Sequence, residues 1–385
     1  MKSFTDQRVL VCGYSQAGYP RDETFLAVLR QFSFKRFFDL RVVDHRWIKY
    51  GILQKSDKSK SLILEYRLKW MRFLIKTLIQ IRQVDFIFIM KWNEDLALDV
   101  IRWARGRDIK IIYDLWVSRY LQAKRDETNQ NKWFELEKTI IEQANYVLAI
   151  TPQYRQFYMQ TYGVSEEKIS VVPHVLETSW FGPRKPDAAE EKKSLIVCYW
   201  GQAHKHHGLA VAFEAAKYLK DIPVEFHFYG PLKLKERVNT AIQSLSLSNI
   251  YYKGFMLDTK TLIQAVDKAD ICLGHLVAEH DAHLVLPNKA IQGMARGKVV
   301  IHIENSDLKY FYQDSDQAIT PLWFFVGTGR RLADDIQTLY NKPALREQIG
   351  MKARQCVFER HSLHNMQTAL ENVMQNMMNE KVLCE

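Results

Sequence analysis

The sequence predicts an α/β protein made of two doubly wound, Rossmann-like domains, and three observations lead to this fold class. The chain has 385 residues, and domains usually contain about 100–200 residues, so two domains are expected. Short apolar runs alternate along the whole chain with longer segments of helical periodicity. These runs are almost continuously apolar, which is typical of parallel strands that helices cover on both faces.

Six strand candidates lie in each half of the chain. Those of the first half cover residues 8–13, 40–44, 86–90, 110–114, 146–150 and 169–173. Those of the second half cover residues 195–200, 225–230, 250–253, 271–275, 299–303 and 317–319. A segment with Gly182, Pro183, Pro186 and a charged run separates the two sets, as expected of a linker.

These boundaries define the expected domains. We predict an N-terminal domain over residues 1–175, a linker over 176–193, a C-terminal domain over 194–362 and a final helix over 363–385, which packs back on the N-terminal domain. Ligands of open α/β sheets bind beyond the carboxyl ends of the strands. Two such domains are therefore expected to face each other across a cleft that holds the site.

Composition excludes several classes of protein. Hydrophobic residues make up 47% and charged residues 25% of the chain, which is ordinary for a globular protein. No run approaches the 18 or so apolar residues that a membrane span needs, and the first eight residues lack the apolar core of a signal peptide. The five cysteines are far apart and form no CxxC pair, which argues against a disulfide framework. A reducing, cytoplasmic location follows.

The positive charge is concentrated in one segment. The net charge is +10, and residues 30–82 alone contain 14 Lys and Arg against 4 Asp and Glu. Within this segment, residues 67–82 have helical spacing, with Trp70, Phe73 and Leu74 on an apolar face that basic residues surround. Such a helix can pack on its own sheet, lie on an anionic membrane surface, or do both. We therefore expect peripheral association with a membrane through residues 30–82, whereas nucleic-acid binding has no matching motif.

The second half opens with a turn suited to binding phosphate. The residues after its first strand candidate include Gly201, Gln202, His204 and Lys205, and an amphipathic helix follows over residues 209–219. Amides at a helix start favour an anion, and the lysine adds a positive charge, although the turn could also serve tight packing alone. The histidines at 204, 206 and 207 lack further spaced ligands, so we predict no metal site.

A second anion site is predicted where a short helix begins at Pro287. Pro287 suits the first helical turn and Gly297 suits the position after the last, so the helix start faces the carboxyl edge of the sheet. The preceding loop holds Glu279, His280 and Asp281. A plain connecting helix after a solvated loop is the alternative interpretation.

A third segment follows the first strand candidate and contains Gly13 and Gly18. Their spacing is not that of the GxGxxG dinucleotide fingerprint, and Tyr19 and Pro20 exclude the phosphate-binding P-loop motif. No GxSxG motif occurs in the chain, so serine-hydrolase chemistry has no support.

These segments, in this order, resemble the GT-B glycosyltransferases of the retaining family-4 type. The resemblance rests on Tyr199-Trp200-Gly201, Phe228-Tyr229-Gly230, Pro287-Asn288-Lys289 and Gly297-Lys298-Val299-Val300, followed by a loop and helix over residues 324–339. It covers roughly residues 85–362, and it is specific in the C-terminal domain and loose in the first 80 residues.

The resemblance implies a transferase that moves a sugar from a nucleotide-sugar donor (a UDP-, GDP- or other NDP-sugar) to a glycan, glycolipid or small-molecule acceptor, with retention and without a metal. The implied donor-binding residues are Gly201, Gln202, His204, Lys205, Tyr229, Gly230, Pro287, Asn288, Lys289 and Gln292. The implied acceptor-binding residues, just beyond N-terminal strands, are Gly18, Tyr19, Arg21, Asp22, Trp116 and Arg119. Lys205, Glu279 and Asp114 are the catalytic candidates.

The chain departs from the family pattern at three positions. Gln202 replaces a basic residue, Gln292 replaces the glutamate that accepts the ribose hydroxyls, and Leu284 stands where another glutamate is expected. Glu279, or alternatively Asp281, would have to serve from a shifted position. A glutamine accepts one hydrogen bond and donates another, so ribose binding would be differently balanced. The departures leave open an altered donor mode, an unusual donor or a nucleotide-sugar binder without catalysis. A GT-B-shaped epimerase using Asp114, Glu279 and His280 is the competing enzyme.

Overall fold

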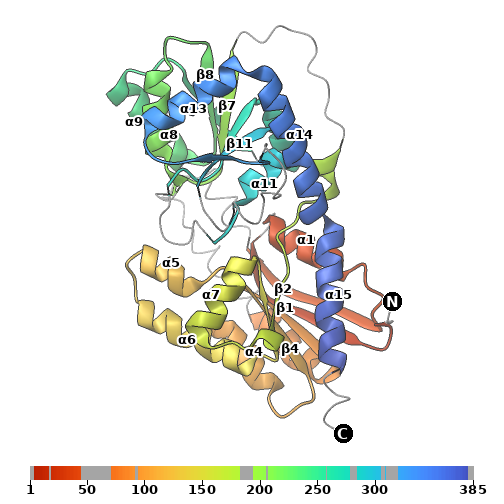
Figure 1. Cartoon of the computed structure of the whole chain (residues 1–385). Coiled ribbons are helices and arrows are strands. Elements are labelled where there is room, and N and C mark those ends of the chain that lie inside the picture. Colours follow the sequence, from red (N-terminus) through yellow and green to blue (C-terminus); the bar gives the residue numbers. More distant parts are fainter. Residues whose placement is uncertain are drawn as a thin grey trace. The chain divides into compact units, whose positions relative to one another are not determined.

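The computed structural model of the chain (Figure 1) describes residues 4–16, 19–44, 71–91, 94–182, 194–204, 207–256, 258–277, 284–304, 308 and 320–379. It contains two compact units, unit 1 with Met1–Val175 and Leu363–Glu385, and unit 2 with Leu176–Ser362. Each unit has one six-stranded sheet in which all paired strands run parallel. The predicted fold class is therefore confirmed.

The sheet of unit 1 has the strand order β2-β1-β3-β4-β5-β6. Its strands are β1 (Arg8–Gln16), β2 (Arg36–Asp44), β3 (Phe86–Met90), β4 (Lys110–Trp116), β5 (Tyr146–Ala149) and β6 (Ile169–Val171). All six strand predictions overlap an observed strand. The helices of the unit with printed bounds are α1 (Pro20–Leu29), α4 (Glu94–Ala104), α5 (Arg119–Arg125), α6 (Gln130–Gln143), α7 (Pro152–Tyr162) and α15 (Leu363–Asn379), with 3₁₀ helices at Ile81–Gln83 and Glu166–Lys168.

The C-terminal helix α15 belongs to the core of unit 1. Met366, Leu370, Val373 and Met377 recur at helical spacing and are all fully buried, together with Phe25 of α1. Figure 1 shows α15 (blue) beside α1 (red), on the opposite side of the sheet from α4, α6 and α7. The last helix thus completes the apolar layer of a unit whose other elements lie more than 180 residues earlier in the chain.

The sheet of unit 2 has the strand order β12-β11-β10-β7-β8-β9. Its strands are β7 (Leu195–Trp200), β8 (Val224–Tyr229), β9 (Ile250–Gly254), β10 (Ile271–Leu273), β11 (Val299–Ile303) and β12 (Trp323–Phe325). Five predictions overlap these strands, and the sixth, residues 317–319, lies outside the described residues. The strand β12 instead falls at the start of the segment that we interpreted as a loop and helix.

Helices cover both faces of this sheet. They are α8 (Leu209–Tyr218), α9 (Leu232–Leu245), α10 (Thr259–Lys268), α11 (Asn288–Ala295), α13 (Gly329–Asn341) and α14 (Pro343–Arg360), with a 3₁₀ helix at Thr178–Phe181. The helices α8, α9 and α13 pack on one face and α11 and α14 on the other (Figure 1). Residues 176–182 of the expected linker pack within unit 2, where Trp180 is buried, and residues 183–193 lie outside the described residues.

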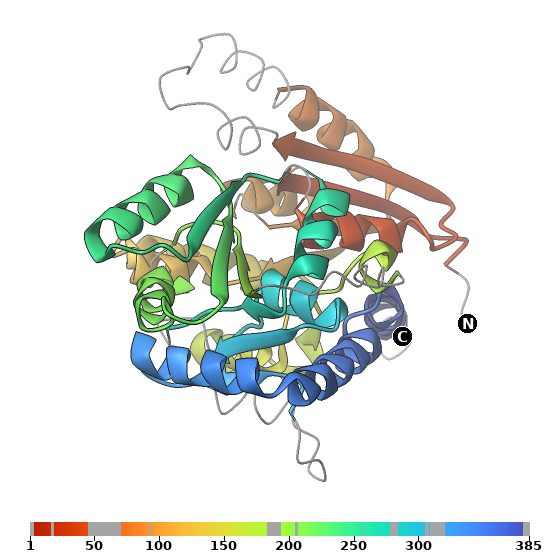
Figure 2. The same ribbon diagram turned by 90° about the horizontal axis from the view of Figure 1, so that it is seen from above.

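The basic segment of the sequence is described only in part. Residues 71–80 are helical, and Figure 2 shows them as the brown coil outside the two long red strands β1 and β2. Phe73 and Thr77 of this helix are buried, whereas residues 45–70 lie outside the described part of the chain. None of the described helices is both long and apolar enough to cross a lipid bilayer.

Candidate functional site

The turns at the carboxyl edge of the unit 2 sheet bring two glycines together. Gly201 follows β7 with a φ of +121°, and its amide donates to the Tyr229 carbonyl at 3.0 Å. A side chain at Gly230, after β8, would collide with the backbone of Gly201. Both positions therefore require glycine, because the turns approach each other closely and one of them has a left-handed backbone. The predicted donor-site residues Gly201, Tyr229 and Gly230 thus form one continuous edge.

Lys289 is the most unusual side chain at this edge. It lies in the first turn of α11 and is only 7% exposed, yet its Nζ makes no hydrogen bond within the described residues. The ammonium lies 4.1 Å from the centre of the Tyr199 ring and 3.9 Å from where a Cβ of Gly201 would stand. Burial holds the pKa of Lys289 well below its ordinary range. A buried ammonium without a carboxylate partner is costly and calls for an anion.

Among the described residues, aromatic rings lie around Lys289. Tyr199 donates its hydroxyl to the Gln202 carbonyl at 2.5 Å and contacts His207 Nδ1 at 2.6 Å. The His207 ring stacks on His275 at 5.0 Å, and His275 lies 5.8 Å from His302. Burial first, and the nearby Lys289 charge in addition, lower the pKa of His302 to about 4, so that its imidazole is neutral near pH 7.

Gln292 has a partner that the sequence did not reveal. The side chain is 6% exposed, and its amide oxygen accepts a hydrogen bond from the indole nitrogen of Trp200 at 2.8 Å. Trp200 is the last residue of β7, so this bond ties α11 to the sheet. The amide oxygen that was expected to serve a ribose is therefore already engaged by the protein.

The start of α11 completes this edge. Pro287 is the N-cap residue and has no side chain that could cap the helix, and Asn288 is the first residue of the helix. Gly297 has the left-handed backbone (φ +67°) predicted for the position after the helix. Because the first amides of a helix have no partner inside it, this start offers donors and a partial positive charge next to Lys289.

The corresponding edge of unit 1 contains paired charges. Arg21 is 1% exposed, and it donates through Nε and Nη2 to the two carboxylate oxygens of Asp114 at 2.9 and 2.6 Å. Its Nη1 donates to the carbonyls of Val172 and Pro173. The two predicted residues are thus brought together as a buried ion pair, in which the guanidinium of Arg21 and the carboxylate of Asp114 bind each other. This arrangement favours a role in positioning, not in proton transfer or direct contact with an acceptor.

A second buried pair lies beside it. Glu137 of α6 is fully buried and accepts from Lys91 Nζ at 2.9 Å, Ser118 Oγ at 2.7 Å and the Arg119 amide at 2.5 Å. It also accepts from the Tyr162 hydroxyl at 2.8 Å. Burial opposes the charged carboxylate, but the Lys91 charge and these donors outweigh it and lower the pKa of Glu137.

The Glu137 cluster holds the loop that carries two predicted acceptor residues. Trp116 ends β4 with a φ of +43°, a strained value for a tryptophan, and its ring meets that of Tyr19 edge-on at 5.0 Å. Arg119 begins α5 with a guanidinium that stacks over Trp133 and lies 3.5 Å from Glu94. Tyr19, Trp116 and Arg119 are half-buried at this edge, whereas Asp22 is buried in α1.

The comparisons with known proteins agree with this architecture. Residues 210–372 match a family model described as glycosyl transferase-like, and none of the curated proteins matches the chain. Among solved structures, sucrose-phosphate synthase of Thermosynechococcus elongatus is similar with a TM-score of 0.74 and 12% identity, over 97% of this chain and 100% of that chain. HepE of Anabaena in complex with UDP is similar with a TM-score of 0.71 and 12% identity, over 96% and 99%. The fold of the chain is therefore that of the GT-B structures, and residues 210–372 are similar to glycosyl transferases.

One further match is a structure with several bound compounds. TarM of S. aureus, in complex with fondaparinux, α-GlcNAc-glycerol and UDP, is similar with a TM-score of 0.57 and 17% identity, over 74% of this chain and 55% of that chain. At these identities the solved structures establish the fold of the chain alone.

Several predicted site residues lie outside the described residues. They are the catalytic candidates Lys205 and Glu279, the acceptor candidate Gly18, and His206, His280 and Asp281. Gln202 and His204 are described and exposed, and His204 meets the His207 ring at 5.3 Å. Among the described residues, no group of three His, Cys, Asp or Glu side chains is arranged to hold a metal ion.

The sequence analysis missed two groups of residues. Glu137 and Lys91 were not singled out, although Glu137 stands on the face of α6 that buries Ile140 and Ile141. A charged residue on the apolar face of a helix is a signal for a buried pair. The histidines His275 and His302 gave no such signal, because only the sheet order brings them next to His207.

Proposed function

We propose that this chain is a glycosyltransferase that binds the diphosphate of a nucleotide-sugar at the carboxyl edge of the unit 2 sheet, and that Lys289 is a direct ligand. The single observation that carries the proposal is the buried Lys289 ammonium, which has no carboxylate partner among the described residues. A bound diphosphate would supply the missing negative charge. The glycine turns at Gly201 and Gly230 would let it approach the backbone closely.

The start of α11 supports the same assignment. Its free amides and the N-terminal dipole favour a phosphate oxygen, and Asn288 adds an amide side chain beside them. Lys205 is proposed as a second cation on the diphosphate, as the family resemblance implies. Together these groups would stabilise the negative charge that develops on the leaving diphosphate, without a metal ion.

The proposed reaction is transfer with retention. The bond between the anomeric carbon of the donor and the diphosphate oxygen breaks, and a bond to the acceptor oxygen forms on the same face. The proton of the acceptor hydroxyl passes to the departing phosphate oxygen. No protein carboxylate is needed as a base in this scheme, which is compatible with the engagement of Asp114 by Arg21.

Among nucleotides, uridine diphosphate is the first to test. Solved structures of the similar protein HepE contain UDP and UDP-glucose. In this chain the Gln292 oxygen is bonded to Trp200, so its amide NH₂ remains to donate to a ribose oxygen. We therefore expect ribose recognition to rely on a donor at this position, where a glutamate would accept.

The acceptor is proposed to meet Tyr19, Trp116 and Arg119. These three side chains stand at the carboxyl edge of the unit 1 sheet, offering two aromatic rings and one cation. Aromatic rings stack on sugar rings, and guanidinium groups bind anionic substituents. A sugar hydroxyl on a glycan or on a lipid-linked acceptor fits this combination.

Binding and turnover with a panel of donors test the proposal. UDP-, GDP-, ADP- and TDP-sugars are screened by thermal shift, and a ligand at 100 times its dissociation constant should add about 2.7 kcal/mol of stability. Turnover of the stabilising donor that requires an acceptor supports a transferase. Turnover without acceptor indicates an epimerase, and affinity without any turnover indicates a binding protein. Failure of every donor to stabilise the protein contradicts the proposal.

A membrane-bound acceptor is favoured by a separate observation on helix 71–80. Met71, Ile75, Leu78 and Ile79 recur at helical spacing and are 53, 59, 42 and 53% exposed. Arg72 and Lys76 flank them and are also exposed. An exposed apolar stripe with basic flanks is suited to the surface of an anionic bilayer.

Flotation with liposomes tests this membrane surface. We expect binding to vesicles that contain anionic lipid and weak binding to neutral ones. Ile75→Asp should abolish flotation, whereas Val326→Asp, which alters a similarly exposed residue of unit 2 (57%), should not. Equal flotation of the two variants, or binding that ignores lipid charge, would contradict the assignment.

A further inference from the structure

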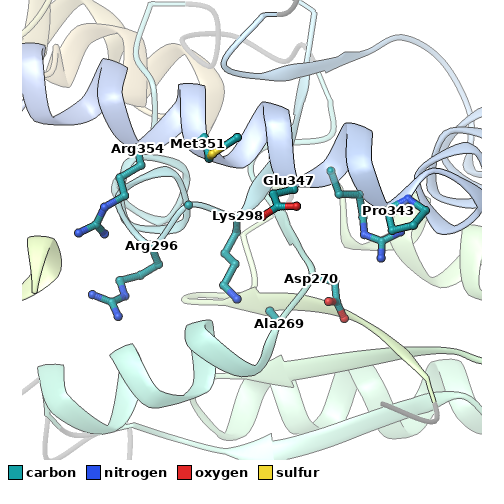
Figure 3. Close-up of a pocket in the computed structure, with 10 residues that line it drawn as sticks. Ala269, Asp270, Arg296, Lys298, Pro343, Glu347, Met351 and Arg354 are labelled. Carbon is teal, nitrogen blue, oxygen red and sulfur yellow. The ribbon is translucent and has the colours of Figure 1, made fainter. Parts of the chain in front are cut away.

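The amino edge of the unit 2 sheet has a cavity that the proposed function does not use (Figure 3). It encloses about 390 Å³. Asp270 and Lys298 line it just before β10 and β11, whereas Gly201 and Gly230 follow β7 and β8. Because all these strands are parallel, the cavity lies at the opposite edge of the sheet from the donor site.

The walls of the cavity carry more positive than negative charge. Four cations line it, Arg296, Lys298, Arg346 and Arg354, against the two carboxylates Asp270 and Glu347. Figure 3 shows Glu347, Met351 and Arg354 along α14, with Lys298 and Asp270 across from them. The cavity therefore has a net attraction for anions.

Two of the arginines are fixed without being neutralised. Arg354 donates to the carbonyls of Ala295 and Phe181, both at 2.6 Å, and Arg346 donates to that of Tyr340 at 3.1 Å. Neither forms an ion pair with a carboxylate of the described residues. Carbonyl oxygens hold a guanidinium in place but bring no full negative charge. Burial and the neighbouring Arg296 lower the pKa of Arg354, as expected where cations accumulate.

The charge of the third arginine of the cavity, Arg296, is already neutralised by a carboxylate. Arg296 makes a bidentate ion pair with Asp267 at 2.7 and 2.8 Å. Arg346 uses only Nη1 in its bonds to the described residues, so Nε and Nη2 retain donor capacity. The capacity to bind an anion therefore lies with Arg346 and Arg354 on α14.

We propose that this cavity binds a phosphate monoester of a small polyhydroxylated molecule, such as a sugar phosphate. The phosphate dianion would contact Arg346 and Arg354, whose positions are set before it binds, so that little ordering is needed. The exposed carboxylate of Glu347 would accept hydrogen bonds from hydroxyl groups of the ligand. A volume of about 390 Å³ lies within the range of small-molecule sites.

Calorimetric titration of the full chain tests the proposal. The probes are glucose 6-phosphate, inorganic phosphate and glucose, each added with and without saturating UDP. We expect glucose 6-phosphate to bind in the presence of UDP, inorganic phosphate to bind more weakly, and glucose not to bind. Equal binding of the two phosphates would show a site for free phosphate and contradict the proposed ester.

Three variants locate the binding. Arg346→Gln should weaken glucose 6-phosphate binding about tenfold, the effect of one lost charge-assisted hydrogen bond. Glu347→Gln should tighten binding of inorganic phosphate, because it removes a repelling charge. The control Arg330→Gln alters an exposed arginine of α13 outside the cavity and should change nothing.

The outcomes also distinguish binding in this cavity from binding at the proposed donor site. UDP binding is measured on its own, so its absence would contradict the choice of uridine as the base and leave the Arg346→Gln comparison valid. Phosphate binding that UDP displaces and that Arg346→Gln does not change would assign the phosphate to the donor site. That result, or the absence of any phosphate binding, would overturn the proposal for the cavity.

Discussion

The carboxyl edges of the two sheets differ in how their buried charged side chains are paired. In unit 1, Arg21 pairs with Asp114 and Lys91 pairs with Glu137, and each of these side chains is almost fully buried. In unit 2, Lys289 is equally buried and has no hydrogen-bond partner within the described residues. The two edges have the same type of fold but differ in whether their charges are compensated.

This difference indicates what each edge needs in order to be complete. A buried ion pair is satisfied without a ligand, so the loops of unit 1 keep their shape whether or not an acceptor is present. A buried lysine without a partner is costly while it is charged, and an anion that binds beside it stabilises its charged form. Under the proposed function, unit 1 would provide a prearranged surface for the acceptor, and unit 2 would provide a site that gains stability when an anion binds. The following changes test this comparison.

The largest effect is expected from breaking a pair in unit 1. Lys91→Met leaves Glu137 as a buried carboxylate without its cation, so the free energy of unfolding should fall by about 3–5 kcal/mol. Lys138→Met, which removes an exposed lysine of α6 that lies 3.9 Å from Glu142, should cost less than about 1 kcal/mol. Urea denaturation of both variants measures the contrast. Equal losses would contradict a special role for the buried pair.

A smaller effect is expected from crowding the glycine turns of unit 2. Gly230→Ala forces a Cβ against the Gly201 backbone and should cost about 1–3 kcal/mol. UDP affinity should fall as well, because the turn next to Lys289 must shift. Gly182→Ala is the control, since a Cβ there meets only an ordinary contact at 3.4 Å. Unchanged stability and affinity in Gly230→Ala would mean that the turn is not tightly constrained.

The hydrogen bond from the Trp200 indole of β7 to the Gln292 side chain of α11 should contribute about 1 kcal/mol to the free energy of unfolding. Trp200→Phe leaves the Gln292 oxygen buried without its donor, and the double variant with Gln292→Met should recover part of the lost stability. Melting temperatures of the single and double variants measure this coupling. Additive losses would show that the two side chains do not depend on each other.

The pH dependence of stability gives a further test, in which one proton is involved. The pKa of Lys289 is lowered from 10.5 by burial, so between the two values the unfolded chain holds one more proton than the folded chain. Stability without ligand should therefore rise with pH through that range. Lys289→Met should remove this slope when urea midpoints are compared between about pH 7 and about pH 10. A slope that persists in the variant would assign it to another group.

Much of the fold could be predicted because it depends on local patterns. Eleven of the twelve strand candidates overlap observed strands, since buried parallel strands are continuous apolar runs. The sixth strand of unit 2, Trp323–Phe325, is only three residues long, and two of its residues lie inside a segment predicted as a loop and helix. Such a short edge strand has too little sequence to be recognised by periodicity.

The site could be predicted less completely because it depends on contacts distant in sequence. Lys289 could be selected from a sequence motif. That its ammonium has no hydrogen-bond partner within the described residues can be seen only in the folded structure. The engagement of Gln292 by Trp200, 92 residues away, left no local trace. The ion pair of Arg21 with Asp114 likewise joins residues that are 93 positions apart in sequence, so no local pattern could reveal it.

The most direct test of this account combines two readouts on Lys289→Met. UDP affinity is measured by calorimetry, and thermal stability is measured without ligand. The account predicts that UDP binding weakens at least tenfold, roughly the effect of one charge-assisted hydrogen bond, while the melting temperature stays the same or rises. A variant that binds UDP normally but melts as early as Lys91→Met would show Lys289 to be structural and contradict the account.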